Sequence, residues 1–297
     1  MSSSLANPRY PLVLVPGLLG FIRLPDYPYW YGIESALRRR GASVHPVAVS
    51  ALHTSEVCGE QLLREVERIR SQTGAAKVNL LGHSQGALTA RYVAALRPDW
   101  VASVTSVAGP NHGSELADYL YRQAPPGSWR ERLIGLLMHG IARLLAWLER
   151  GYRGPPLPLD SRAAHQSLTT AGVAAFNQEF PQGLPARWGG EGPAEVQGVR
   201  YYSWSGTLQP GLSDRGGNRF DLSNRFCRLF ARSFVREAGQ CDGMVGRYSS
   251  HLGRVIRDDY PFDHLDIVNQ SHGLVGLGAD PVAVFLEHAA RLQADGC

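Results

Sequence analysis

Short apolar runs alternate with amphipathic segments along the first third of the chain. The apolar runs are too short for buried helices and predict parallel strands at residues 10–15, 43–49, 78–81 and 101–107. Between them, apolar residues at three- and four-residue spacing predict helices at residues 31–40, 54–74 and 85–96. This alternation predicts an α/β fold, with a mostly parallel central sheet and helices on both of its faces.

The regular alternation ends after residue 114, and a long amphipathic helix is predicted at residues 130–150. An apolar stripe runs along this helix from Leu133 to Leu148. The helix is either packed on the core as an ordinary surface helix, or it is a lid whose apolar face covers a greasy site and turns toward lipid. We expect one domain, residues 1–297, with a helical lid insertion at residues 115–160. The remaining predicted elements are a helix at 172–180, a strand at 199–204, a loop at 215–223 and a helix that begins at Asp280-Pro281.

The composition excludes several classes of protein. The chain has 297 residues, of which 44% are hydrophobic and 19% charged, as in an ordinary globular protein. Its net charge of +4 is spread along the chain and gives no sign of nucleic-acid binding. No run is long and uncharged enough to be a transmembrane segment. The N-terminus shows no signal peptide, so we expect a cytoplasmic protein, or one secreted by a route that needs no signal peptide.

The four cysteines give no metal signal. Their spacing matches no zinc pattern, and we expect free thiols at Cys58, Cys227, Cys241 and Cys297. Cys227 with Cys241 is the only pair that we would test as a disulfide.

The candidate chemistry begins at Gly82-His83-Ser84-Gln85-Gly86, which stands between a predicted strand and a predicted helix. This context is typical of a nucleophile elbow, in which a serine on a sharp turn presents its hydroxyl above the sheet. Gly82 and Gly86 are needed because side chains there would collide across the turn. The alternative is an ordinary strand-to-helix turn with a capping serine, and the rest of the chain must decide.

A serine hydroxyl needs a base and an acid, which follow it along the chain in this fold. The late histidines are His251, His264, His272 and His288. Of these, His264 lies in a turn-rich loop able to reach Ser84, whereas His288 lies in the predicted terminal helix and is expected at the surface. The candidate acids are Asp221, Asp242, Asp258 and Asp259. Asp242 follows the last predicted strand, but spacing alone leaves the acid open.

The oxyanion hole is better determined by the sequence. One donor should be the backbone N–H of Gln85, directly after the nucleophile. The other should come from the loop after the first strand, around Leu18, where Gly17 and Gly20 allow close approach. A plain β-turn is the alternative for this loop.

Several longer segments together carry a family resemblance. They are residues 10–21, 31–38, 78–86, 91–95, 201–206, 249–253 and 264–270, within a likeness that runs from about Tyr10 to Arg291. In these segments the chain resembles the bacterial true lipases of subfamily I.1, the Pseudomonas and Proteus group, which are α/β-hydrolases.

The resemblance implies a site and a cofactor. It implies Ser84, Asp242 and His264 as the catalytic triad and the amides of Leu18 and Gln85 as the oxyanion donors. It also implies a structural Ca²⁺, held by the carboxylates of Asp221 and Asp266 and the main-chain carbonyls of Gln270 and Leu274. Calcium prefers oxygen ligands of these kinds. Because Asp266 is two residues from His264, the ion would hold the loop that positions the base.

Three features depart from the family pattern. Pro16 stands where the family usually has histidine, which puts the geometry of the oxyanion loop in doubt. The cysteine pair of the secreted Pseudomonas members is missing, with Tyr248 at one position and the other near Trp188-Gly189. Gln85 and residues 111–114 look more like the Proteus branch, which has no signal peptide or disulfide and needs no dedicated foldase. We also expect a monomer.

The sequence therefore predicts a triacylglycerol lipase, whose substrate is a lipid or ester at an oil–water interface. An esterase or polyester depolymerase with the same triad is the alternative within the hydrolases. A catalytically silent α/β-hydrolase that binds a lipid or a partner is the alternative from another class, and only Pro16 supports it.

Overall fold

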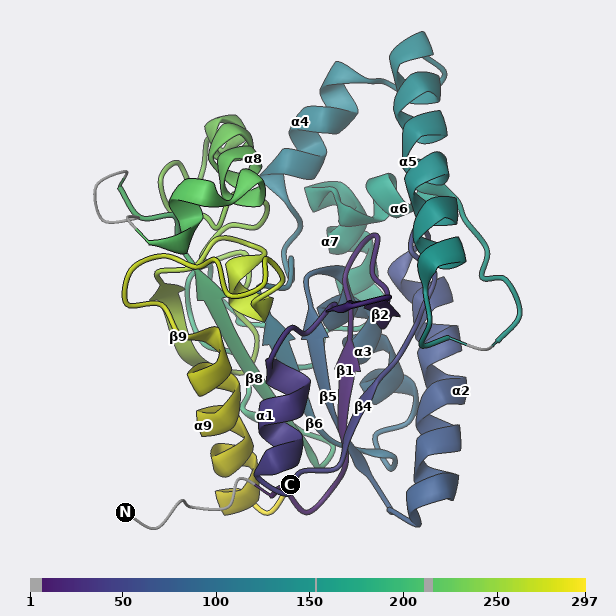
Figure 1. Ribbon diagram of the computed structural model, residues 1–297, viewed down its shortest axis with the longest axis vertical. Coiled ribbons are helices and arrows are strands. Elements are labelled where there is room, and N and C mark those ends of the chain that lie inside the picture. The colour runs from purple at the N-terminus through teal and green to yellow at the C-terminus, as the bar shows by residue number, and fades with distance from the viewer. Residues whose placement is uncertain (1–6, 153, 211–215) are drawn as a thin grey trace.

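A seven-stranded sheet forms the centre of the computed structural model, which describes residues 7–152, 154–210 and 216–297 (Figure 1). The strand order is β4-β1-β5-β6-β8-β7, and β9 also pairs with β8. All pairs in this sheet are parallel except β7 with β8. The strands are β1 Leu12–Val15, β4 Val44–Pro46, β5 Val78–His83, β6 Val101–Val107, β7 Glu195–Val196, β8 Val199–Gly206 and β9 Arg254–Tyr260, and a separate antiparallel pair joins β2 Arg23–Leu24 to β3 Tyr27–Pro28.

Helices cover both faces of the sheet (Figure 1). α1 Ile33–Arg39 and α9 Pro281–Ala294 cover one face, and α2 Ser55–Thr73 and α3 Gln85–Leu96 cover the other. Leu12 and Leu14 of β1 pack with α1 and α9, whereas Val13 and Val15 pack with α2 and α3. Successive side chains of a strand point to opposite faces, so a strand buried on both faces must be apolar throughout.

The ends of these elements follow the signals in the sequence. The side chain of Thr54 accepts a hydrogen bond from the Val57 N–H at the start of α2, and Gly74 ends that helix in the left-handed conformation, with φ 68°. Asp280 caps α9 in the same way as Thr54 caps α2, before Pro281. Pro46 lies in β4 at the edge of the sheet, as a proline without an N–H donor requires.

Further helices lie beyond the carboxyl ends of the strands (Figure 1). They are α4 Glu115–Gln123, α5 Trp129–Leu148, α6 Ser161–Leu168, α7 Thr170–Glu179 and α8 Leu222–Phe230, with short 3-10 turns η1 Gly217–Phe220, η2 Ala231–Ser233 and η3 Asp266–Val268. α4 and α5 fall inside the expected insertion at residues 115–160, whose extent stays a prediction.

Most of the apolar stripe of α5 is exposed. Ala142 is the only buried residue of this helix. The exposed large apolar side chains on it are Trp129, Leu133, Ile134, Leu136, Leu137, Ile141, Leu144 and Trp147. α5 therefore buries little of its apolar stripe against the core, with Leu145 among the half-buried exceptions.

Some expectations from the sequence are wrong. The strand at 199–204 is not the last one, because β9 follows Asp242. His288 is fully buried rather than at the surface, and its Nε2 lies 2.8 Å from the hydroxyl of Thr105. In the expected loop at 215–223, residues 217–220 form η1 and α8 begins at Leu222, while residue 215 lies outside the described residues.

Two further expectations concern a disulfide bond and a transmembrane segment. All four cysteines are buried and free, so Cys227 and Cys241 do not form a disulfide. Within the described residues, no helix has both the length and the hydropathy that crossing a bilayer requires.

Candidate active site

Ser84 stands on a strained turn between β5 and α3. Its φ of 54° and ψ of −128° lie in a region that residues other than glycine rarely adopt. A Cβ atom on Gly82 would lie 2.2 Å from the carbonyl oxygen of Gly86, and one on Gly86 would lie 2.4 Å from that of Val15. Both glycines are thus required by close backbone approach, which is the geometry of a nucleophile elbow.

A buried histidine–carboxylate pair lies on two loops that flank β9. His264 Nδ1 is 2.7 Å from Asp242 Oδ2, and both side chains are buried. The other carboxylate oxygen of Asp242 accepts the N–H groups of Met244 and Val245, at 2.8 and 2.7 Å. Asp242 therefore accepts a hydrogen bond from the N–H group at Nδ1 of the imidazole, which leaves the lone pair of Nε2 for another partner.

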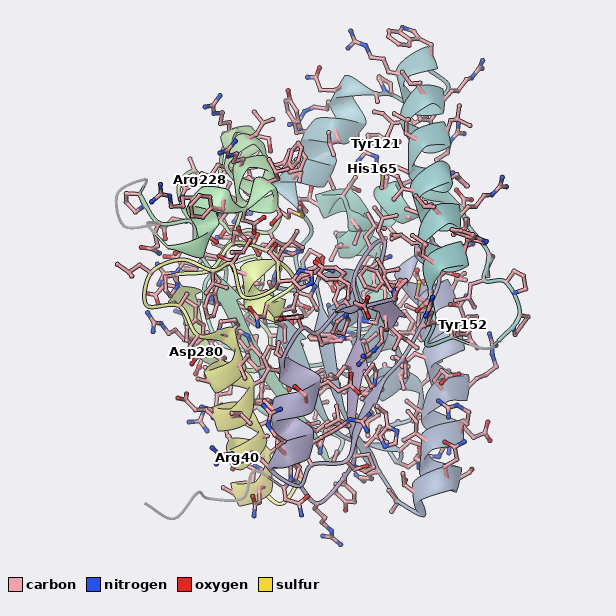
Figure 2. All side chains as sticks on the ribbon, in the orientation of Figure 1. Arg40, Tyr121, Tyr152, His165, Arg228 and Asp280 are labelled. Atoms are coloured by element: carbon pink, nitrogen blue, oxygen red, sulfur yellow. The ribbon has the colours of Figure 1, made fainter. Side chains whose placement is uncertain are left out.

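Ser84 and His264 line one cavity of about 240 Å³. No hydrogen bond joins their side chains among the described contacts, and such bonds are often long before a substrate binds. Most of the lining is apolar and comes from α4, α5, α6 and the loops at the ends of the strands, with Leu18, Leu116, Leu120, Ile134, Met138 and Leu168 as examples. Tyr121 and His165 also line it, and their rings meet edge to face between α4 and α6 (Figure 2).

The two predicted oxyanion donors are the backbone amides of Leu18 and Gln85. The N–H groups of Leu18 and Gln85 have no hydrogen-bond partner among the described residues. A Cβ atom on Gly17 would lie 2.7 Å from Cβ of Ser84, so the loop after β1 passes directly beside the serine. The Gly20 N–H closes this loop on the Gly17 carbonyl at 3.0 Å, and Pro16 packs against Gly20.

The other late histidines and acids have partners elsewhere. His251 lies 3.0 Å from Asp258, which also pairs with Arg247. Asp259 pairs with Arg257. His272 packs on the rings of Tyr27 and Tyr31, and His288 bonds to Thr105. Of the four late histidines, His264 alone lines the cavity that contains Ser84.

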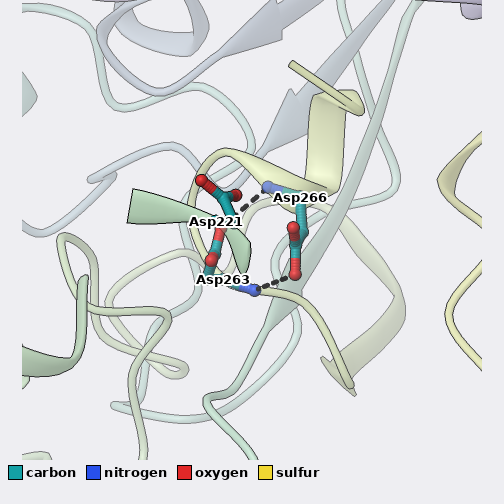
Figure 3. A group of neighbouring side chains, drawn as sticks. All are labelled: Asp221, Asp263 and Asp266. Carbon is teal, nitrogen blue, oxygen red and sulfur yellow. Dashed lines mark hydrogen bonds between the residues drawn. The ribbon is translucent and has the colours of Figure 1, made fainter. Parts of the chain in front are cut away.

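Three carboxylates meet on the far side of the His264 loop. Oxygen atoms of Asp221, Asp263 and Asp266 all lie within 4.8 Å of one another (Figure 3). One oxygen of Asp266 is buried without a hydrogen-bond partner. Burial, reinforced by the neighbouring carboxylates, raises the pKa of both Asp263 and Asp266. Such a group of crowded anions is stabilised when a cation lies between them.

The predicted carbonyl ligands belong to the same neighbourhood. The Gln270 carbonyl accepts a hydrogen bond from the hydroxyl of Tyr27, whose pKa is raised by burial and by the charge of Asp221. Leu274 packs against Gly217, in the turn that ends at Asp221. Asp263 was missed by the sequence analysis, although its place three residues before Asp266 is a signal. Asp263 also accepts the N–H groups of Leu265 and Asp266, each at 2.8 Å, and thereby closes the turn that carries His264.

Comparison with known proteins agrees with this architecture. A family model described as the alpha/beta hydrolase fold matches residues 10–187. A triacylglycerol lipase of Pseudomonas fragi is 49% identical over 290 residues, which cover 98% of this chain and 98% of that protein. A triacylglycerol lipase of Vibrio cholerae serotype O1 is 45% identical, over 97% of this chain and 89% of that protein. The crystal structure of Staphylococcus hyicus lipase has a TM-score of 0.62 at 17% identity, over 97% of this chain and 96% of that chain, and so supports the fold alone.

These matches confirm the predicted fold class. The family model covers more than half of the chain, and two relatives align along nearly all of it. The chain therefore belongs to the α/β-hydrolase family.

Proposed function

We propose that this protein is a triacylglycerol lipase, which cleaves the carboxylic ester bonds of acyl glycerols through an acyl-enzyme. The observation that carries the proposal is that Ser84 and His264 line one apolar cavity while Asp242 binds the far nitrogen of the imidazole. An apolar cavity suits the acyl chain of such an ester. The names of the Pseudomonas and Vibrio relatives point to the same substrate class.

In the proposed mechanism, Ser84 attacks the ester carbonyl while Nε2 of His264 accepts its proton. Asp242 holds the ring and stabilises the imidazolium that forms. The amides of Leu18 and Gln85 bind the oxyanion of each tetrahedral intermediate. His264 then returns the proton to the leaving alcohol and activates the water that hydrolyses the acyl-enzyme.

A series of p-nitrophenyl esters measured alongside emulsified triolein tests this proposal. Ser84→Ala should lower kcat by about 10⁴-fold or more and abolish labelling by a fluorophosphonate probe. Ser71→Ala, which removes an exposed hydroxyl from α2, is the control and should change neither. A profile that peaks at acetate, with no hydrolysis of triolein, would favour an esterase or polyester depolymerase instead.

The exposed stripe of α5 supports the proposal that residues 115–160 act as a lid that meets the lipid surface. Leu136 and Trp147 are 72% and 79% exposed, as expected for side chains whose partner is not part of the chain. Leu136→Ser and Trp147→Ser should lower the rate on emulsified triolein several-fold and leave the rate on dissolved p-nitrophenyl butyrate unchanged. Leu96→Ser is the control, because Leu96 is exposed at the far end of α3. Equal losses on both substrates would refute the lid.

The cluster of Asp221, Asp263 and Asp266 fits the calcium ion that the family resemblance implies. Its crowded carboxylates and the unpartnered oxygen of Asp266 suit a hard cation. Asp221 and Asp266 would hold the ion together with the carbonyls of Gln270 and Leu274, and the ion would supply charge neutralisation beside the His264 loop.

Chelation tests the calcium proposal. EDTA should lower the Tm, and added Ca²⁺ should restore it. Asp266→Asn should abolish this response, whereas Asp259→Asn, on the exposed edge of β9, should keep it. An unchanged Tm in EDTA, with no metal found by elemental analysis, would refute the site.

The resemblance also supports finer proposals. We place the protein in subfamily I.1 of the bacterial true lipases, nearer the Proteus branch, on the strength of Gln85 and residues 111–114. As implied by that branch, the protein should fold without a dedicated foldase, and we also propose that it is a monomer. Refolding of the purified chain from urea, followed by size-exclusion chromatography, tests both properties, and a need for a second protein would contradict them.

A further inference from the structure

A chain of buried hydrogen bonds runs behind the candidate active site. The Gly17 N–H donates to the Tyr29 hydroxyl at 3.1 Å. The same hydroxyl lies 2.7 Å from Nδ1 of His83, and Nε2 of His83 lies 2.9 Å from the carbonyl oxygen of His264. Tyr29 and His83 are 3% and 1% exposed, so water does not compete for these bonds. We call Tyr29 and His83 with their two backbone partners the relay.

The partners determine which atom donates and which accepts in each hydrogen bond of the relay. A carbonyl oxygen only accepts, so Nε2 of His83 must carry the proton that it donates to His264. A neutral imidazole then presents a lone pair at Nδ1, and the Tyr29 hydroxyl must donate to it. The lone pair of that hydroxyl remains for the Gly17 N–H. Only this one arrangement satisfies all four groups.

A charged His83 would break the arrangement. With a second proton on Nδ1, the hydroxyl proton of Tyr29 would lose its acceptor, and a buried cation would lie beside the His264 ring at a centroid distance of 4.7 Å. Burial accordingly lowers the pKa of His83 well below its usual value, with a further contribution from His264. The neutral form with the proton on Nε2 is thus the stable one.

The two ends of the relay belong to the two halves of the site. Gly17 precedes Leu18, whose amide is a proposed oxyanion donor, and its Cα packs against Ser84. At the other end is the main chain of His264, the proposed base. These two segments are about 250 residues apart along the chain and share no backbone hydrogen bond among the described residues. Tyr29 and His83 are therefore a direct polar connection between them.

We propose that Tyr29 and His83 are positioning residues, which hold the oxyanion loop and the His264 loop at the separation that the reaction requires. The proposal rests on the triad mechanism proposed above. It does not place either side chain in contact with the reacting atoms. Tyr29 and His83 act through Gly17 and through the carbonyl of His264. Loss of either should mainly affect the chemical step, because small displacements of a catalytic group are costly there.

The kinetics of four variants test the proposal. Tyr29→Phe and His83→Phe should each lower kcat on dissolved p-nitrophenyl butyrate about ten-fold, the equivalent of one lost buried hydrogen bond, and change KM less than about two-fold. Because either change breaks the connection between Gly17 and the carbonyl of His264, the double variant should lose no more than about as much as one single variant. His83→Gln keeps a donor for the His264 carbonyl and should recover part of the loss.

The chain contains a matched control pair. Tyr202 and His288 are also buried and in ring contact, and each makes a hydrogen bond: Tyr202 to the partly buried Asp295, and His288 to the buried Thr105. Neither lines the cavity at Ser84. Tyr202→Phe and His288→Phe should lower the Tm about as much as the relay variants, with kcat unchanged. If the relay variants lose stability but keep kcat, as the controls do, the proposal is wrong.

Nitrogen NMR of histidine-labelled protein gives a readout independent of activity. The His83 ring should show a protonated Nε2 and an unprotonated, hydrogen-bonded Nδ1, and it should not titrate between pH 5 and 9. Tyr29→Phe should shift the Nδ1 resonance of His83 and also the resonances of the His264 ring. The opposite tautomer, or a His264 ring that does not respond, would overturn the relay. Failure of the lipase proposal is recognised separately, by retained activity in Ser84→Ala.

Discussion

The buried carboxyl of Glu237 should make the stability of the protein depend on pH. Glu237 is 3% exposed and accepts the N–H groups of Tyr248 and Ser249. Glu115 lies close by, since its own carboxylate accepts the N–H of Glu237 at 3.0 Å. Burial, aided by the charge of Glu115 and opposed by the two N–H groups, raises the pKa of Glu237 from 4.5 to about 7.

The sign of the effect follows from which state binds the proton more tightly. Between pH 4.5 and 7 the folded protein keeps a proton on Glu237 that the unfolded chain has released. The free energy of unfolding therefore falls as the pH rises through this interval. At ~1.4 kcal/mol for each pH unit, the fall between pH 5 and pH 8 is about 2 to 3 kcal/mol. For a chain of this length, that is about 5 °C in Tm.

Urea unfolding of the wild type and of Glu237→Gln at pH 5, 6, 7 and 8 measures this contribution. The glutamine side chain has no proton to lose. Between pH 5 and pH 8, the free energy of unfolding of Glu237→Gln should therefore fall by about 2 to 3 kcal/mol less than that of the wild type. Glu67→Gln, at an exposed position on α2, should keep the wild-type slope. If Glu237→Gln shows the slope of the wild type, the buried carboxyl is already ionised near its usual pKa and the reasoning fails.

Three further experiments probe glycine positions, buried thiols and a buried arginine. Gly86→Ala brings a methyl group to 2.4 Å from a carbonyl oxygen and should abolish soluble folded protein. Gly140→Ala lies in open space on α5 and should raise the Tm, because alanine favours a helix by about 1 kcal/mol. Equal yields of the two variants would contradict the close approach at Gly86. The four buried thiols should not react with Ellman's reagent in the native protein and should all react in urea, and a fast-reacting native thiol would be contrary evidence. Arg91 is buried and donates to partly buried acceptors on Asn177 and Phe180. Arg91→Met removes both hydrogen bonds and should cost about 3 kcal/mol in urea unfolding, while a loss below about 1 kcal/mol would show that water replaces the guanidinium.

Elements with strong local signals could be predicted from the sequence. The helix predicted at 85–96 and the strand predicted at 101–107 have the same bounds as α3 and β6. Their signals are a short valine-rich run for β6 and an apolar period for α3, with glycine or proline nearby. Each of these acts within a few residues, so no knowledge of the rest of the fold is needed.

β9 and α8 were both missed, and only β9 lacks the expected pattern. Four of the seven residues of β9 are charged, and most of the strand is exposed or half-exposed. This segment forms a strand because its backbone pairs with β8, although its composition is not typical of a strand. α8 does carry a local signal, because Leu222, Phe226, Leu229 and Phe230 recur at three- and four-residue spacing. The structure leaves Leu222, Phe226 and Leu229 of this apolar face exposed.

The candidate site shows the same division between local and distant signals. The elbow at Ser84 and its Gln85 amide follow from adjacent residues. The choice of Asp242 needed the family resemblance, because four acids satisfied the chain order equally well. Tyr29 could not be assigned, since it reaches the site only through contacts that folding creates.

Three contacts within residues 263–266 position His264, and each holds a different part of this segment. Asp242 binds the ring, His83 binds the carbonyl, and Asp263 closes the turn. The first two determine where the imidazole points, whereas the third, with the proposed calcium ion, determines whether the loop stays folded. Removing calcium should then lower stability more than kcat, and breaking the relay should lower kcat more than stability. The two kinds of perturbation are therefore separable, although they meet within four residues.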